Sequence, residues 1–86
     1  MTYSKIKLYT ASGIPESLSN LWYKDDSSVV EIEDAVEDAS DSNDLLNSIK
    51  KLNLLRKFSL DRENDKRIRF KCTDCWGNVS YFEVIR

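Results

Sequence analysis

Histidine is absent from this sequence, and glycine is almost absent, with only Gly13 and Gly77. Histidine is the commonest general base and the commonest metal ligand in proteins, so its absence removes a member from most catalytic and metal-binding schemes. Two separated glycines also leave no glycine-rich loop that could hold a phosphate group. We therefore expect a protein that is not an enzyme and that binds no metal ion or other cofactor.

Long apolar runs are missing as well. The longest are pairs such as Val29-Val30 and Leu45-Leu46, whereas a membrane-spanning helix needs about 20 predominantly apolar residues. The sequence thus predicts neither a membrane segment nor the apolar core of a signal peptide. Only two cysteines are present, which fits a reducing compartment. We expect a cytoplasmic protein that does not associate with a membrane.

The composition that remains is that of one folded domain. Hydrophobic residues make up 41% of the chain and charged residues 33%, which is ordinary for a folded protein and unlike a disordered one. A chain of 86 residues is long enough for one modest core but not for two. We therefore expect a single domain over residues 1–86.

The clearest secondary-structure signal lies near the end of the sequence. Two alternating runs, Arg67–Thr73 and Val79–Ile85, flank the turn residues Trp76-Gly77-Asn78, which predicts a β-hairpin. A three-residue loop at Trp76–Asn78 fixes the pairing of the two strands. The predicted pairs are Phe70 with Val84, Cys72 with Phe82, and Lys71 with Glu83.

Alternation divides the side chains of this hairpin between two faces. The apolar face carries Ile68, Phe70, Cys72, Phe82 and Val84. The other face, which can stand in water, carries Arg67, Arg69, Lys71, Thr73, Tyr81, Glu83 and Ile85. Because a lone hairpin is at best marginally stable, the rest of the chain must supply further strands and cover the apolar face.

Two elements are predicted near the start of the chain. Thr2–Thr10 alternates between apolar and polar residues, as a half-buried strand does. Pro15 suits the first turn of a helix, and the apolar residues around it recur at helical spacing. These residues are Ile14, Leu18, Leu21 and Trp22. We expect this helix to end near Lys24.

The next stretch, Ser27–Ser42, fits either a helix or a short strand. Apolar and acidic residues alternate within Val29–Glu33, as they would in a strand. A helix is favoured by the capping-box pair Ser28 and Glu31 and by four apolar residues at helical spacing. These four are Val29, Ile32, Val36 and Ala39. We predict a helix, with the strand as the alternative.

A further helix is predicted to begin with Ser42 or Asn43 as its cap. Its apolar stripe consists of Leu45, Leu46, Ile49 and Leu52. Leu54–Leu60 then reads as a strand, and Arg62–Asp65 as a polar turn into the hairpin. The whole pattern predicts an α+β domain, in which an N-terminal strand and a C-terminal three-stranded meander form a four-stranded, mainly antiparallel sheet with two or three helices on one face.

The acidic segment is the least ordinary part of the composition. Residues Asp25–Asp44 contain nine carboxylates and no basic residue. If the segment is helical, like charges stand three or four positions apart, as Glu33 and Glu37 do, and five such pairs cost about 1 to 2.5 kcal/mol before solvent screening. The nine carboxylates are Asp25, Asp26, Glu31, Glu33, Asp34, Glu37, Asp38, Asp41 and Asp44.

Three explanations compete for these carboxylates. They could be neutralised within the fold by Arg67, Arg69 and Lys71, or could simply keep the surface soluble. They could instead bind a protein with a basic surface, because carboxylates three or four positions apart on a helix lie about 5 to 6 Å from one another, a spacing similar to that of neighbouring phosphates. Cation binding is disfavoured, because no twelve-residue calcium loop is present. We expect the second explanation, with Trp76 as an exposed aromatic anchor.

In size, acidity and lack of catalytic residues, the chain resembles the small inhibitors that bacteriophages use against host restriction or CRISPR machinery, some of which imitate DNA. That resemblance implies an anti-defence or host-takeover protein that blocks or regulates a larger, nucleic-acid-binding protein. The partner-binding residues would be the nine carboxylates and Trp76.

A basic face of the predicted sheet is the alternative site. Aromatic residues among cations on an open antiparallel sheet are how sheet-type RNA binders stack bases and neutralise phosphates. The residues concerned are Lys57, Arg67, Arg69, Lys71 and Tyr81, with Lys5, Lys7 and Tyr9 on the first strand. The strands lack the glycine and aromatic pattern of the RNA-recognition motif, and a net charge of −2 repels nucleic acid at long range. Direct binding of RNA or single-stranded nucleic acid is therefore the second hypothesis.

Cys72 and Cys75 have the spacing of some zinc and thiol-redox motifs. A structural zinc ion needs four ligands, and this chain offers two thiols and no imidazole. Redox pairs of this kind begin a helix, whereas Cys72 lies in a predicted strand. We predict structural cysteines, with Cys72 packed in the core as a small apolar residue.

Overall fold

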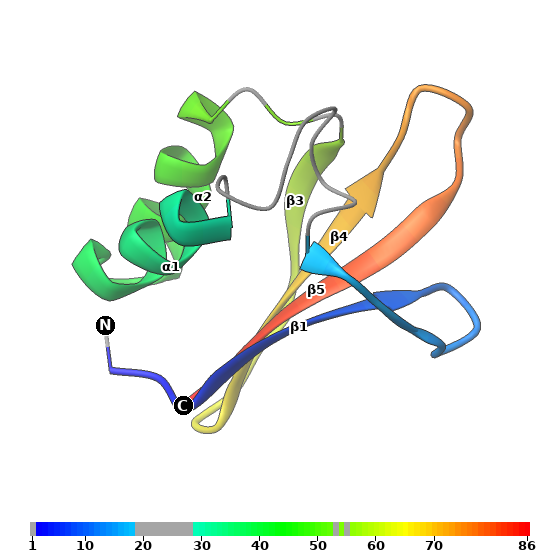
Figure 1. Cartoon of the computed structure of the whole chain (residues 1–86). Coiled ribbons are helices and arrows are strands. Elements are labelled where there is room, and N and C mark those ends of the chain that lie inside the picture. Colours follow the sequence, from blue (N-terminus) through cyan, green and yellow to red (C-terminus); the bar gives the residue numbers. More distant parts are fainter. Residues whose placement is uncertain (1, 19–28, 53, 55) are drawn as a thin grey trace.

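Five antiparallel strands form one sheet, and two helices lie on one of its faces (Figure 1). The computed structural model describes residues 2–18, 29–52, 54 and 56–86. The elements in chain order are β1 (Lys5–Thr10), β2 (Pro15–Glu16), α1 (Val29–Asp38), α2 (Ser42–Lys51), β3 (Lys57–Glu63), β4 (Arg67–Thr73) and β5 (Val79–Ile85). The predicted α+β class is confirmed, but the described sheet has five strands instead of four.

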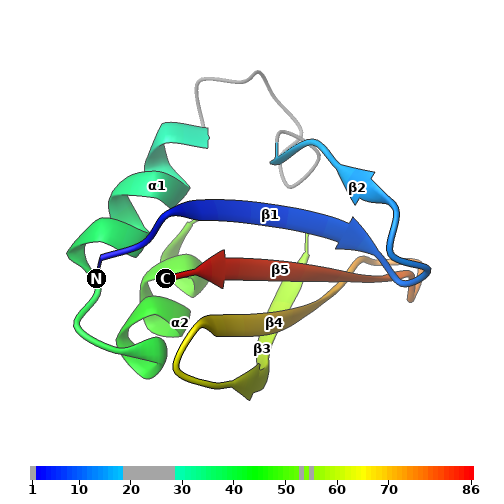
Figure 2. The same cartoon turned by 90° about the horizontal axis from the view of Figure 1, so that it is seen from below.

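The sheet order is β2-β1-β5-β4-β3. The hairpin strand β5 therefore lies at the centre, between β1 and β4. Both helices lie on the same face, with α1 nearer to β1 and α2 nearer to β3 (Figure 2). The opposite face of the sheet is not covered by either helix.

The fifth strand, β2, stands where a helix was predicted to begin. Gly13 has a φ of 88°, a left-handed conformation that glycine adopts without steric cost. The backbone N–H of Thr10 donates to the Ile14 carbonyl at 2.8 Å, which turns the chain back onto β1. Pro15 lacks an N–H and is tolerated on an edge strand. The predicted helix start is therefore wrong, and residues 19–24 of that prediction lie outside the described residues.

The β4–β5 hairpin has the predicted faces but not the predicted pairs. Phe70 pairs with Phe82, whereas Val84 was predicted. The turn spans residues 74–78 because the Asp74 side chain accepts hydrogen bonds from two backbone N–H groups within it, both at 2.9 Å. A shift of two residues leaves every side chain on its face, so alternation could not reveal this error.

The ambiguous stretch after residue 28 is helical in the structure. Ile32 and Val36 of α1 are fully buried, as the helical spacing predicted, and the strand alternative for Val29–Glu33 is wrong. Residues 27 and 28, including the predicted capping residue Ser28, lie outside the described residues. The helix ends at Asp38, so Asp41 is not part of it.

The cap of α2 is Asp41, rather than Ser42 or Asn43. The Asp41 carboxylate accepts a hydrogen bond from the backbone N–H of Asp44 at 2.8 Å. Ser42 instead donates its hydroxyl to the Glu63 carboxylate on β3 at 2.7 Å, which ties the start of the helix to the edge strand. Asp41 is adjacent to the two predicted caps and has a similar capping propensity, so sequence alone could not separate the three residues.

Replacing Asp41 with Ala is expected to lower the free energy of unfolding by about 1 kcal/mol, because one N–H group of the first turn of α2 loses its acceptor. Replacing it with Asn should have little effect, because Asn caps helices as well as Asp does. Urea denaturation followed by circular dichroism measures both variants. Equal stability of the Ala variant and the unchanged protein would contradict this role for Asp41.

The strand β3 starts later than predicted and contains a bulge. Leu60 pairs with Phe70, but Arg62 pairs with Arg69, so Asp61 is the additional residue. A bulge changes the direction of the side chains that follow it. Arg62 consequently lies on the face of the sheet that is away from the helices. The turn into β4 follows after Glu63, later than the predicted Arg62–Asp65.

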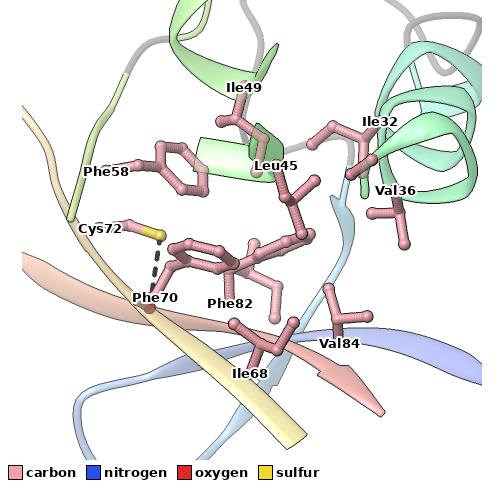
Figure 3. Packing of buried hydrophobic residues seen from close by; sticks show 12 residues of the cluster. Ile32, Val36, Leu45, Ile49, Phe58, Ile68, Phe70, Cys72, Phe82 and Val84 are labelled. Atoms are coloured by element: carbon pink, nitrogen blue, oxygen red, sulfur yellow. Dashed lines mark hydrogen bonds between the residues drawn. The ribbon is translucent and has the colours of Figure 1, made fainter. Parts of the chain in front are cut away.

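The core lies between the helices and the sheet (Figure 3). The ring of Phe82 lies 5.8 Å from that of Phe58 and 6.0 Å from that of Phe70, centre to centre. Leu45 and Ile49 of α2 cover these rings from the helix side. The apolar face predicted for the hairpin is confirmed, since all five of its residues are buried: Ile68, Phe70, Cys72, Phe82 and Val84.

Candidate functional site

The outer side of α1 carries a group of exposed carboxylates, which we call the acidic helix surface. Its members are Glu31, Glu33, Asp34, Glu37 and Asp38, and all of them are exposed. They face outward because Ile32 and Val36, on the other side of the helix, pack into the core. Two further carboxylates of the predicted site, Asp25 and Asp26, lie outside the described residues.

Asp41 and Asp44 have a structural role that the sequence prediction missed. Asp41 caps α2, and the Asp44 carboxylate accepts hydrogen bonds from the backbone N–H and the hydroxyl of Ser40, at 2.9 and 3.3 Å. The two side chains hold the connection between the helices in place. We therefore leave them out of the acidic helix surface, although both are exposed.

The neutralisation of the acidic segment by Arg67 and Arg69, one of the explanations considered from the sequence, is not found among the described residues. Within the described ranges, no lysine or arginine lies within ion-pair distance of Glu31, Glu33, Asp34 or Asp38. Arg67 and Arg69, which were candidates for that neutralisation, pair instead with Glu83 on the other face of the sheet.

Tyr3, just before β1, lies within the field of these carboxylates. Burial of the phenol, together with the charges of Glu33, Glu37 and Asp34, raises the pKa of Tyr3 above its usual value. The last turn of α1 contains no basic residue, although cations would be favoured there by the helix dipole. The field of the acidic helix surface thus extends beyond the helix to the start of β1.

The face of the sheet opposite the two helices carries the predicted basic site. We call it the open sheet face, and its members are Lys5, Lys7, Tyr9, Lys57, Arg62, Arg67, Arg69, Lys71, Tyr81 and Glu83. Their shared face follows from the strand pairing, in which Tyr9 pairs with Tyr81 and Tyr81 pairs with Lys71. The structure therefore brings together the five residues predicted as the alternative site.

Glu83 is the carboxylate among these ten residues and is only 4% exposed. Its two oxygens bind two cations: Oε2 lies 3.2 Å from a guanidinium nitrogen of Arg67, and Oε1 lies 3.5 Å from one of Arg69. The predicted partner was Lys71, which the shift in register moves away. Glu83 therefore fixes the two arginines beside each other at the centre of the face.

A second polar cluster is partly buried, and no pattern in the sequence predicted it. Arg56 donates to the Ser80 hydroxyl at 2.7 Å and lies 3.4 Å from the Glu16 carboxylate. Ser80 in turn donates to Glu16 at 3.1 Å. The cluster connects β2, β5 and the segment before β3, so we assign it to stability rather than to binding.

Trp76 is 83% exposed, as predicted. It belongs to the turn between β4 and β5, which lies at the end of the hairpin away from the two helices (Figures 1 and 2). The structure therefore does not bring Trp76 together with the acidic helix surface. We remove it from that site.

The two thiols do not form a site together. Cys72 is buried, whereas Cys75 is exposed in the turn. The described residues contain no group of three or more thiols and carboxylates that could hold a metal ion. Cys72 lies in the core, as predicted, and packs beside the phenylalanine rings.

Comparison of the chain with protein-family models, with curated proteins and with solved structures finds no match. Neither of the described helices has the length and the apolar character needed to cross a membrane. The two charged surfaces are therefore the features of the molecule that bear on its function.

Proposed function

We propose that this protein is a non-enzymatic binding protein that occupies a basic surface on a larger protein, and that it does so with the acidic helix surface. The observation that supports this proposal is the separation of charge in the fold. The exposed carboxylates of α1 lie on the helix layer, while the cations expected to neutralise them lie on the open sheet face. In the part of the chain that the structure describes, Glu31, Glu33, Asp34 and Asp38 have no ion pair with a lysine or arginine, and such carboxylates are electrostatically suited to a positively charged partner.

The placement of the carboxylates along α1 also supports the proposal, because it does not favour the stability of the helix. Like charges remain at helical spacing in Glu33 with Glu37 and in Asp34 with Asp38, and such pairs destabilise a helix. Glu37 and Asp38 also stand at the end of the helix where the dipole disfavours negative charge. Only Glu31, in the first turn, is placed where the dipole is favourable.

A nucleic-acid-binding protein is the class of partner we propose. Carboxylates at this spacing follow one another at about 5 to 6 Å along the helix, so they can occupy a groove whose lysines and arginines ordinarily bind phosphates. Phage-type inhibition of a host defence or nucleic-acid-processing protein in the cytoplasm is the biological role this proposal favours.

Reversing Asp34 and Asp38 to Lys is expected to reduce capture of the partner at least about tenfold, because two attractive contacts become repulsive. The tagged protein would be used to capture proteins from a host lysate, and the captured protein would then be challenged with duplex DNA. Release by the DNA is the expected result, because both ligands would occupy the same groove.

The matched control reverses Asp61 and Asp65 to Lys, which changes the net charge by the same amount at the far edge of the sheet. Capture should be retained by this variant. Equal capture by the Asp34 and Asp38 variant and by the unchanged protein, or a captured protein that duplex DNA does not release, would refute the proposal.

A further inference from the structure

The open sheet face has an excess of positive charge that sheet stability does not explain. Seven cations and one carboxylate are placed on it by the strand pairing. Exposed neighbours across strands are stabilising when their charges are opposite and destabilising when they are alike. Here Arg62 lies directly opposite Arg69, and Asp61 offsets only part of that repulsion, at 3.7 Å from Arg62.

The bulge in β3 is what brings the third arginine to this face. Arg62 joins Arg67 and Arg69 around a depression of about 290 Å³, which Asn64 and Glu83 also line. Each guanidinium carries five N–H donors in a planar fork that matches phosphate oxygens. Glu83 engages one nitrogen each of Arg67 and Arg69, so donors remain on both for a bound phosphate.

A second depression, of about 420 Å³, adjoins the first and is lined by tyrosines. Tyr9 and Tyr81 lie opposite each other on β1 and β5, and both line this depression. The Arg69 guanidinium lies 4.5 Å from the centre of the Tyr81 ring. Nucleobases stack on aromatic rings and on guanidinium planes alike. Arg67, Arg69 and Glu83 line both depressions, so the two form one continuous surface.

The spacing of the cations suits one extended strand of nucleic acid. Arg67, Arg69 and Lys71 follow every second residue of β4, which places their Cα atoms about 6.6 Å apart. Lys5 and Lys7 form a similar row on β1, and β5 separates the rows, so they stand about 9.6 Å apart. A single strand of nucleic acid lying along β5 would have cations on both sides and tyrosines beneath its bases. A duplex would keep its bases stacked inside and away from those rings.

We propose that the open sheet face binds single-stranded nucleic acid, with phosphates on the arginine-lined depression and bases on Tyr9 and on the stacked pair of Arg69 and Tyr81. This site is independent of the acidic helix surface, because the sheet and the core beneath α1 separate the two surfaces (Figure 1). The Debye length is about 8 Å at physiological ionic strength, so the carboxylates of α1 do not cancel the local charge of this face.

The test measures binding of fluorescein-labelled oligothymidylate and oligouridylate by fluorescence anisotropy, between about 50 and about 200 mM salt. Replacing Arg62 and Lys71 with Ala should weaken binding of both oligomers about tenfold. The slope of the logarithm of the binding constant against the logarithm of the salt concentration should become shallower by about 1.4, the value for two lost phosphate contacts on a single-stranded nucleic acid. Arg67 and Arg69 are kept, because their removal would leave buried Glu83 without its partners.

Two further variants separate binding from folding. The change of Tyr9 to Thr keeps a residue that favours strands but removes a ring, so binding should weaken about fivefold or more, whereas Tyr9 to Phe should bind normally. The matched control changes Lys50 and Lys51, on α2, to Ala and should bind as the unchanged protein does. Circular dichroism verifies that each variant is folded.

Three results would overturn the proposal: no binding of either oligomer by the unchanged protein at about 50 mM salt, equal losses in the Arg62 and Lys71 variant and in the control, or tighter binding of the corresponding duplex. Equal affinity for oligothymidylate and oligouridylate would indicate that the protein contacts only phosphates and bases. Higher affinity for oligouridylate would indicate that it also contacts the 2′-hydroxyl groups. The variant with Asp34 and Asp38 reversed should still bind both, so failure here is distinguishable from failure of the proposed function.

Discussion

Phe82 replaced by Ala is expected to lose about 3 to 5 kcal/mol of the free energy of unfolding. The Phe82 ring is fully buried, it contacts the rings of both Phe58 and Phe70, and it stands on β5, the central strand. Its removal leaves a cavity that fixed neighbours on both sides cannot fill, and that cavity adds to the lost transfer free energy. The whole free energy of unfolding of a small domain is about 5 to 15 kcal/mol, so the variant should be close to unfolding.

Urea denaturation followed by circular dichroism measures this loss. Phe82 to Leu serves as a milder variant, because it retains most of the apolar volume, and it should lose much less than the Ala variant. Val30 to Ala is the control, because Val30 is exposed on α1, and it should change stability by less than about 0.5 kcal/mol. A loss below about 1 kcal/mol for Phe82 to Ala would mean that the core is not centred on this ring.

Alkaline pH is expected to destabilise the protein through Cys72. Burial raises the pKa of the Cys72 thiol from 9.0 to about 12. In the unfolded chain the thiol loses its proton near pH 9, while in the folded protein it keeps the proton until about pH 12. The unfolded state therefore binds fewer protons in this window, and the free energy of unfolding falls as pH rises, by about 1.4 kcal/mol for each pH unit.

The measurement compares the pH dependence of stability above pH 9 in the unchanged protein and in the variant Cys72 to Val. The variant should have a distinctly flatter profile, whatever its stability at neutral pH. Cys75 to Val is the control, and it should keep the steep profile because Cys72 remains. Identical slopes for the unchanged protein and the Cys72 variant would show that the thiol is not held protonated by the fold.

Side-chain alternation and helical spacing were sufficient to predict which face of each main helix and strand is buried. They placed Phe70, Phe82 and Val84 in the core and identified α1 and α2, because burial of one face is what fixes those periods. They did not fix the pairing of β4 with β5, because a shift of two residues preserves the faces. That pairing depends on the Asp74 side chain, whose hydrogen bonds are specific to this turn.

The open sheet face was predictable in part. Alternation put Arg67, Arg69 and Tyr81 on one face of the hairpin, but the position of Arg62 depends on a bulge that no periodicity reveals. The role of Glu83 follows from its two ion pairs, and these require the actual register. The acidic helix surface was predictable from the composition of the segment. The structural role of Asp41 was not, because Ser42 and Asn43, which follow it, are equally suitable helix caps.

The central position of β5 has a consequence for the order of folding. The first of the described strands, β1, pairs with the last of them, β5, and the Ser4 hydroxyl donates to the carbonyl of Ile85, 81 residues later. Until β5 leaves the ribosome, β1 has no central partner and β4 has only β3. Pairings between such distant segments slow folding, and unpaired strand edges are prone to aggregation in the interval. Overproduction at lower temperature or with chaperones should therefore raise the yield of folded protein.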